Sequence, residues 1–122
     1  MDLKKWKSTI KRHCKSVGTY QKAFDPVIDT LAEILVKRDE AEELYESTGR
    51  QSVVEHTNKA GASNIEQNPI LRLINDLNRD ALQYWRDLGL TPAGLRKIND
   101  EALKEQKMSP LDRVLANLEG DE

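Results

Sequence analysis

Apolar residues recur at intervals of three and four positions along most of this chain, a spacing that places them on one face of an α-helix. The pattern predicts helices over residues 3–16, 26–47 and 69–88, another from residue 92, and a short one over 110–118. A helix over residues 69–88 would be about 28 Å long. Its apolar stripe consists of Ile70, Leu71, Ile74, Leu77, Ala81, Leu82, Trp85 and Leu88.

All prolines follow a residue suited to capping a helix, in the pairs Asp25-Pro26, Asn68-Pro69, Thr91-Pro92 and Ser109-Pro110. Proline is favoured at the first position of a helix and disfavoured in its interior. The pairs therefore place helix starts where the apolar stripes begin. Gly89 suits a left-handed helix end, so residues 68–99 are predicted to form a helical hairpin with a tight turn at this glycine.

The helical pattern breaks between Gly49 and Asn68. Residues 53–54 and 62–65 flank Asn58-Lys59-Ala60-Gly61, which is compatible with a short β-hairpin over residues 53–66 or with an ordered loop. The predicted fold is therefore all-α, a helical-hairpin core with a basic N-terminal helix, and residues 53–66 are the one place for strands.

The composition of the chain sets its size and class. It has 122 residues, of which 38% are hydrophobic and 33% charged, and this suits one folded domain. The single Cys14 excludes an internal disulfide and fits a reducing compartment. No apolar run approaches the roughly 20 residues of a membrane span. A soluble protein without membrane contact is expected.

The net charge of −2 hides a strong asymmetry along the chain. Residues 1–24 carry a net charge of +6 and residues 25–50 a net charge of −5. The domain is therefore divided into a basic N-terminal helix (1–24), an oligomerisation core (25–106) and a short acidic C-terminal helix or tail (107–122). Two interpretations fit this charge asymmetry. Acidic and basic elements pair between subunits, or the basic end is free to bind phosphate groups.

The basic residues of the first helix lie opposite its apolar stripe of Leu3, Trp6 and Ile10. Bases on one face of a helix neutralise DNA phosphates and release counterions. The predicted DNA-binding set is Lys4, Lys5, Lys7, Lys11, Arg12 and Lys15. A solvated helix surface fits the same pattern, and a membrane-surface helix fits it less well because the apolar face is narrow.

The run from Tyr84 to Pro92, YWRDLGLTP, resembles the small subunit of tailed-phage terminases, as does the preceding Asn68-Pro69-Ile70-Leu71. Arg96 and Lys97 fall where that family has its terminal basic residues. The specific match covers about a quarter of the chain. The acidic end at residues 119–122 departs from the basic or disordered tail often found in the family.

The resemblance implies a non-catalytic packaging factor in the host bacterial cytoplasm. It implies that the chain recognises the packaging site on viral double-stranded DNA and passes that DNA to the terminase large subunit. It further implies a homo-oligomeric ring, expected here to have roughly eight to ten subunits. The predicted ring contacts, some of which would serve the subunit core instead, are Leu31, Leu35, Leu77, Trp85 and Leu88.

Two other functions are compatible with the pattern. A small dimeric helix-turn-helix regulator would place the helix from residue 92 in a major groove through Arg96 and Lys97. A structural adaptor would pair the basic helix with the acidic helix of a neighbouring subunit.

Enzyme chemistry is not indicated. The chain has no Gly-rich phosphate loop, and His13, Cys14 and His56 lack the spacing of a zinc site. The acidic run 39–43 is more simply a solvated or subunit-pairing face than a nuclease cluster. No catalytic residue, metal site or cofactor is expected.

Overall fold

The computed structural model describes residues 1–107, 114, 115 and 118. It is mostly helical, with one antiparallel pair of strands in the described residues. The elements in chain order are α1 (Leu3–Val17), the 3-10 turn η1 (Lys22–Phe24), α2 (Asp25–Ser47), β1 (Val53–Thr57), β2 (Ser63–Gln67), α3 (Pro69–Asp87) and α4 (Pro92–Lys107). The helix predicted over 110–118 and the acidic end lie largely outside the described residues.

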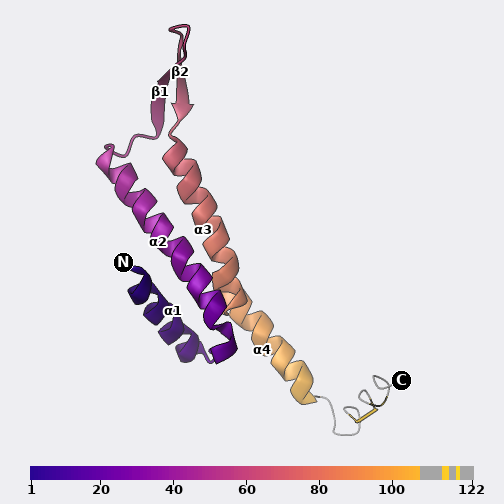
Figure 1. Ribbon diagram of the computed structural model, residues 1–122. Coiled ribbons are helices and arrows are strands. Elements are labelled where there is room, and N and C mark those ends of the chain that lie inside the picture. The colour runs from indigo at the N-terminus through magenta and orange to yellow at the C-terminus, as the bar shows by residue number, and fades with distance from the viewer. Residues whose placement is uncertain (108–113, 116–117, 119–122) are drawn as a thin grey trace.

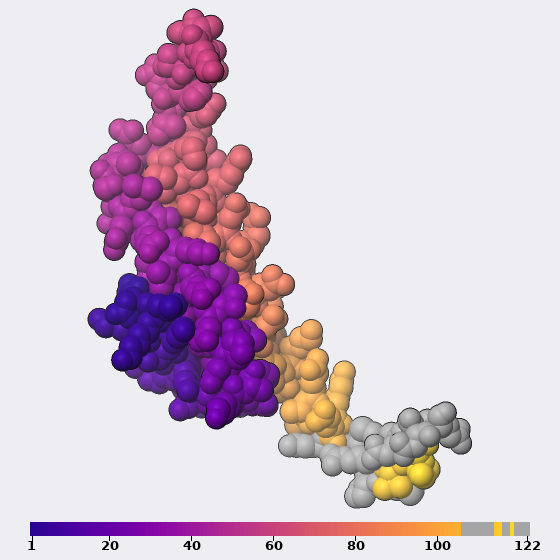
Figure 2. Space-filling model, viewed as in Figure 1, coloured from indigo at the N-terminus to yellow at the C-terminus, as the bar shows by residue number. Residues whose placement is uncertain are grey.

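The long helices α2 and α3 run antiparallel, and the β-hairpin joins them at one end (Figure 1). Helix α1 lies along the half of α2 that is farther from the hairpin. The hairpin and α4 project from opposite ends of this helical body, as the space-filling view shows (Figure 2).

The chain is helical as predicted except at residues 53–57 and 63–67, which form the two strands of the β-hairpin that the sequence left open against a loop. Strand β1 pairs with β2 in a register that sets Val53 opposite Gln67 and Thr57 opposite Ser63. The Asn58 side chain accepts hydrogen bonds from the backbone amides of Ala60 and Ala62, both at 3.0 Å. These bonds close the turn locally. The β-hairpin is therefore confirmed over the ordered loop.

The predicted helical hairpin at Gly89 is also wrong, because α4 leads away from α3 instead of folding back along it (Figure 1). Gly89 does have the expected left-handed conformation, with φ of 73°. However, Gly94 packs so closely on the last turn of α3 that a Cβ there would collide with the carbonyl oxygen of Arg86. This contact directs α4 outward. Residues 88–94 are called the elbow below.

Capping explains most of the helix starts. Asn68 accepts a hydrogen bond from the Ile70 amide at 3.1 Å, and Thr91 accepts one from the Gly94 amide at 3.0 Å. Asp25 does not cap α2 as the sequence suggested. Its carboxylate accepts a hydrogen bond from the Tyr20 hydroxyl at 3.0 Å, and the turn η1 leads into the helix instead.

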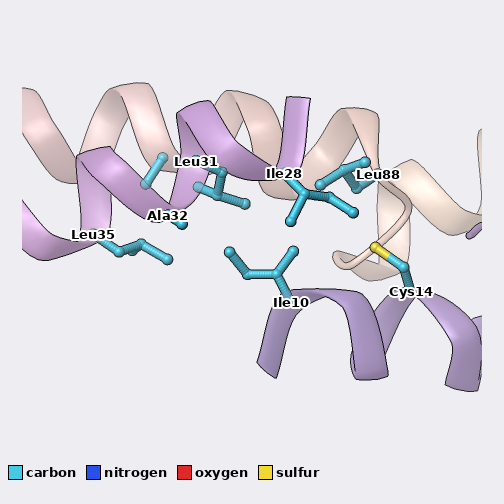
Figure 3. Packing of buried hydrophobic residues seen from close by; sticks show 8 residues of the cluster. Ile10, Cys14, Ile28, Leu31, Ala32, Leu35 and Leu88 are labelled. Carbon is cyan, nitrogen blue, oxygen red and sulfur yellow. The ribbon is translucent and has the colours of Figure 1, made fainter. Parts of the chain in front are cut away.

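The main core lies where α1 meets α2 and α3, and most of its members are labelled in Figure 3. It consists of Ile10, Cys14, Ile28, Leu31, Ala32, Leu35, Ala81 and Leu88. A smaller cluster of Ala41, Tyr45 and Ile74 joins α2 and α3 nearer the hairpin. Burial of these apolar side chains away from water is the main contribution that holds α1 against α2 and α3.

Candidate nucleic-acid interface

One side of helix α1 packs against the core, and the opposite side is exposed to solvent. Ile10 and Cys14 are fully buried against the core, and Trp6 packs beside them. The indole nitrogen of Trp6 donates a hydrogen bond to Asp39 of α2 at 2.7 Å. The Asp2 carboxylate caps the start of the helix by accepting from the Lys5 amide at 2.8 Å. The rigid placement of α1 fixes where its basic side chains point.

Four of the six predicted DNA-binding residues are exposed on the outer side of α1. We call this set, Lys4, Lys5, Arg12 and Lys15, the outer basic face. Lys4, Lys5 and Arg12 also line an open hollow of about 500 Å³ together with Ser8 and Thr9. Hydroxyl groups beside cations offer hydrogen bonds to phosphate oxygens. The arrangement suits a phosphate backbone lying along α1.

The other two bases are engaged within the chain. The Lys7 ammonium lies 3.5 Å from the Asp29 carboxylate of α2. Lys11 and Lys15 both lie over the Tyr20 ring, at 5.1 Å and 5.2 Å from its centroid. The Tyr20 hydroxyl, through a hydrogen bond and its charge, raises the pKa of Lys11, with a smaller contribution from Asp25. Lys7 and Lys11 therefore have partners within the chain, and Lys15 of the outer basic face shares the contact with Tyr20.

The acidic residues of α2 meet the basic helix of their own chain. Asp29 pairs with Lys7, and Asp39 pairs with the α-amino group of Met1 at 3.1 Å. The adaptor hypothesis expected such pairing between neighbouring subunits. The structure shows that part of it is satisfied inside one chain.

The second group of candidate DNA-binding residues lies on α4. Arg96 and Lys97 are exposed, and the exposed acids Asp100 and Glu101 follow within one turn. They lie near the start of α4, where Leu95 lines the same hollow as His13 and Ser16 of α1, and the helix then projects from the helical body (Figure 1).

The elbow itself borders an apolar hollow of about 710 Å³ that the sequence did not reveal. Trp85, Leu90, Pro92 and Leu95 line it from the α3–α4 side, and Val17 from α1. The threonine at position 19 ties the two sides together, because its hydroxyl donates to the Leu88 carbonyl at 2.7 Å. The family-like run of residues 84–92 thus builds this junction.

The residues predicted for ring contacts divide into two groups. Leu31, Leu35 and Leu88 are buried within the single chain and serve its core. Leu77 and Trp85 are half-buried and keep exposed surface. The sequence placed Leu82 in the apolar stripe of its helix, yet Leu44, Leu73 and Leu82 are about half exposed, at 53%, 50% and 45%.

The described residues offer little for catalysis. Within them, no group of three or more His, Cys, Asp and Glu is placed to hold a metal ion. Burial raises the pKa of the Cys14 thiol, which is fully enclosed and so fits a packing role. None of the described helices is long and apolar enough to cross a membrane.

Residues 3–105 match the family model described as "Phage terminase, small subunit". No curated protein and no solved structure matches the chain. The match spans α1 to α4, so it includes both the outer basic face and the elbow. Members of this family are generally non-catalytic, which agrees with the expectation that the chain is not an enzyme. The chain belongs to the family of phage terminase small subunits.

Proposed function

We propose that this protein binds viral double-stranded DNA through the outer basic face of α1 and delivers it to the terminase large subunit. The observation that carries the proposal is the exposure of Lys4, Lys5, Arg12 and Lys15 on one side of a firmly packed helix. These cations gather at one end of a chain whose net charge is −2. A cluster of like charges raises the local electrostatic potential and steers a polyanion such as DNA toward it.

The assembly that we propose is a homo-oligomeric ring of roughly eight to ten subunits. A ring repeats α1 around its circumference, and several weak phosphate contacts then act together on one duplex. Recognition of the packaging site and control of the large subunit's ATPase and nuclease belong to the same proposal. The family membership supports both partners.

The test is DNA binding by a chain in which Lys4, Lys5, Arg12 and Lys15 are all changed to Glu. If four phosphates are neutralised per subunit, the logarithm of affinity falls with the logarithm of salt with a slope of about −3.6 per subunit. We expect the variant to lose retention of a duplex in a gel shift at low salt and to lose that salt dependence. Unchanged retention would refute the assignment to α1.

A matched control separates α1 from α4. The double change Arg96→Ala and Lys97→Ala removes the exposed bases of the α4 start, and we expect it to leave both affinity and sequence preference intact. A loss of sequence preference in this control would instead favour the helix-turn-helix regulator.

A further inference from the structure

Helix α3 exposes leucines on opposite sides. Leu73 and Leu82 are nine positions apart, which is about two and a half helical turns, so their side chains leave the helix in opposite directions. They are 50% and 45% exposed. Between them, on the side facing α2, the helix is buried through Ile74 and Ala81. The α2–α3 pair therefore has an apolar edge on each flank.

The flank that carries Leu73 is acidic. Leu73 and Leu77 of α3 line a groove of about 280 Å³ with Ala41, Leu44 and Glu40 of α2, and Lys37 is the cation beside it. Glu33 and Glu40 line the adjoining groove beside Leu3. On α3, Asp76 and Asp80 each follow one of these leucines by three positions, which places them on the same side of the helix. We call this flank the acidic leucine face.

The flank that carries Leu82 is basic. Arg79 precedes Leu82 by three positions and Arg86 follows it by four, so both lie beside it on the helix surface. Arg72 extends the row by a further two turns, and all three arginines are exposed. The guanidinium of Arg79 lies 3.8 Å from the carboxylate of Asp76, one turn earlier on the same helix. We call this flank the arginine face.

We infer that the acidic leucine face of one copy binds the arginine face of the next copy of this chain. Beside its leucines the acidic leucine face carries Glu33, Glu40, Asp76 and Asp80 against the one cation Lys37, whereas the other face carries arginines. The net charges of the two faces are opposite in sign, so unlike faces attract while like faces repel. The contact is therefore heterologous, with each subunit using different surfaces toward its two neighbours. A heterologous contact forms a ring if its rotation closes. This inference rests on the proposed assembly, and it replaces the buried Leu31, Leu35 and Leu88 as contact residues.

The experiment uses the full chain with Leu73→Asp in one variant and Leu82→Asp in the other. Native mass is measured by light scattering for the unaltered chain, for each variant and for their equimolar mixture. Each variant loses one face and keeps the other. We expect both to be monomers alone and to form a 1:1 dimer when mixed, because the intact arginine face of the first meets the intact acidic leucine face of the second.

Other outcomes overturn the inference. If one variant keeps the full mass while the other dissociates, like faces pair with like and the contact is isologous. If both keep the full mass, neither face is the interface. A mixture that stays monomeric also contradicts the pairing. Far-UV circular dichroism and thermal unfolding of each variant show that the substitutions at these half-exposed positions leave the subunit folded.

A charge exchange provides a second test that leaves the leucines in place. Changing Arg79 and Arg86 to Glu makes the arginine face acidic, and we expect at least a tenfold weaker assembly. Adding Asp76→Arg and Asp80→Arg to the same chain reverses the opposite face, and assembly should recover. Absence of recovery overturns the pairing. These mass measurements contain no DNA, so a failure of α1 to bind DNA would leave them unaffected, and the mass of the unaltered chain tests the assembly by itself.

Discussion

Gly89 and Gly49 share a left-handed backbone but differ in their surroundings. Their φ angles are 73° and 80°. A Cβ at Gly49 would meet no atom within 4 Å, whereas one at Gly89 would lie 3.0 Å from side-chain atoms of Ile98 and Thr19. We predict that Gly49→Ala lowers the free energy of unfolding by about 1–2 kcal/mol through backbone strain alone. Gly89→Ala should cost about 2–4 kcal/mol, since crowding adds to the same strain. Urea unfolding of the two variants measures the difference, and equal losses would mean that the elbow is loosely packed.

Asp39 gives the stability of the subunit a dependence on acid pH. Burial alone would raise its pKa, but hydrogen bonds from the Trp6 indole, the α-amino group and Arg38 outweigh that effect and hold the pKa below its ordinary value. A carboxylate with a lowered pKa stabilises the fold fully above its unfolded pKa of about 3.9 and loses that contribution as the pH falls further.

We therefore predict that Asp39→Asn is less stable than the unaltered chain by about 1–3 kcal/mol at pH 7. The gap should narrow as the pH is lowered below about 4, because protonation then removes the same charge from the unaltered chain. Denaturant unfolding followed by tryptophan fluorescence at several pH values provides the measurement. A gap that is constant with pH would show that the hydrogen bonds do not depend on the charge.

Single residues were predictable from the sequence where their role is local. Asn68 and Thr91 cap helices as expected, because a cap needs only the next two or three amides. The partners of Asp25 and Lys7 were not predictable, because each lies outside the residue's own stretch of helix: Tyr20 for Asp25 and Asp29 for Lys7. The spacing of residues in the sequence does not show which side chains of different elements pack together.

At the scale of elements, the β-hairpin stands apart from the core (Figure 2). An isolated two-stranded hairpin is marginally stable and adds little to the subunit. We predict that Ile65→Thr, at a side chain 79% exposed, changes the free energy of unfolding by less than about 0.5 kcal/mol. The matched change Ile74→Thr, at a side chain 6% exposed in α3, should cost about 2–4 kcal/mol. Comparable losses in thermal unfolding would show that the hairpin belongs to the cooperative unit.

Element positions were predicted better than element directions. Helices α1, α2 and α3 begin within one residue of the sequence prediction, because apolar periodicity and the Pro pairs are local signals. The direction of α4 was not predictable, since it depends on how closely Gly94 packs on the Arg86 carbonyl. From the sequence alone, Gly94 is simply a weak helix former. The packing shows that a residue without a Cβ is needed there, beside the Arg86 carbonyl.

For the whole molecule, the sequence located the basic surface of α1 but not the exposed leucines that we propose as subunit contacts. The outer basic face follows from helical spacing on one element, so four of the six predicted residues are placed as expected. The flanks of α3 depend on which side of the helix α2 covers. Leu73 and Leu82 are equally apolar in the sequence, as is the buried Leu31, and only the packing separates flank from core.

We propose different elements for DNA binding and for assembly, α1 and α3, and this separation makes a last prediction possible. The Leu73→Asp monomer keeps the whole outer basic face, so each subunit retains its own phosphate contacts. A ring holds several copies of that face, and linked contacts raise apparent affinity by about 100-fold or more without any new contact. We therefore expect the monomer to bind a long duplex at least about 100-fold more weakly than the assembled chain, with a smaller salt dependence.

On a duplex short enough to occupy one subunit, the two proteins should bind equally, as fluorescence anisotropy would show. If the monomer bound the long duplex as tightly as the assembly, one α1 would suffice and the repetition of the basic face would have no part in DNA binding.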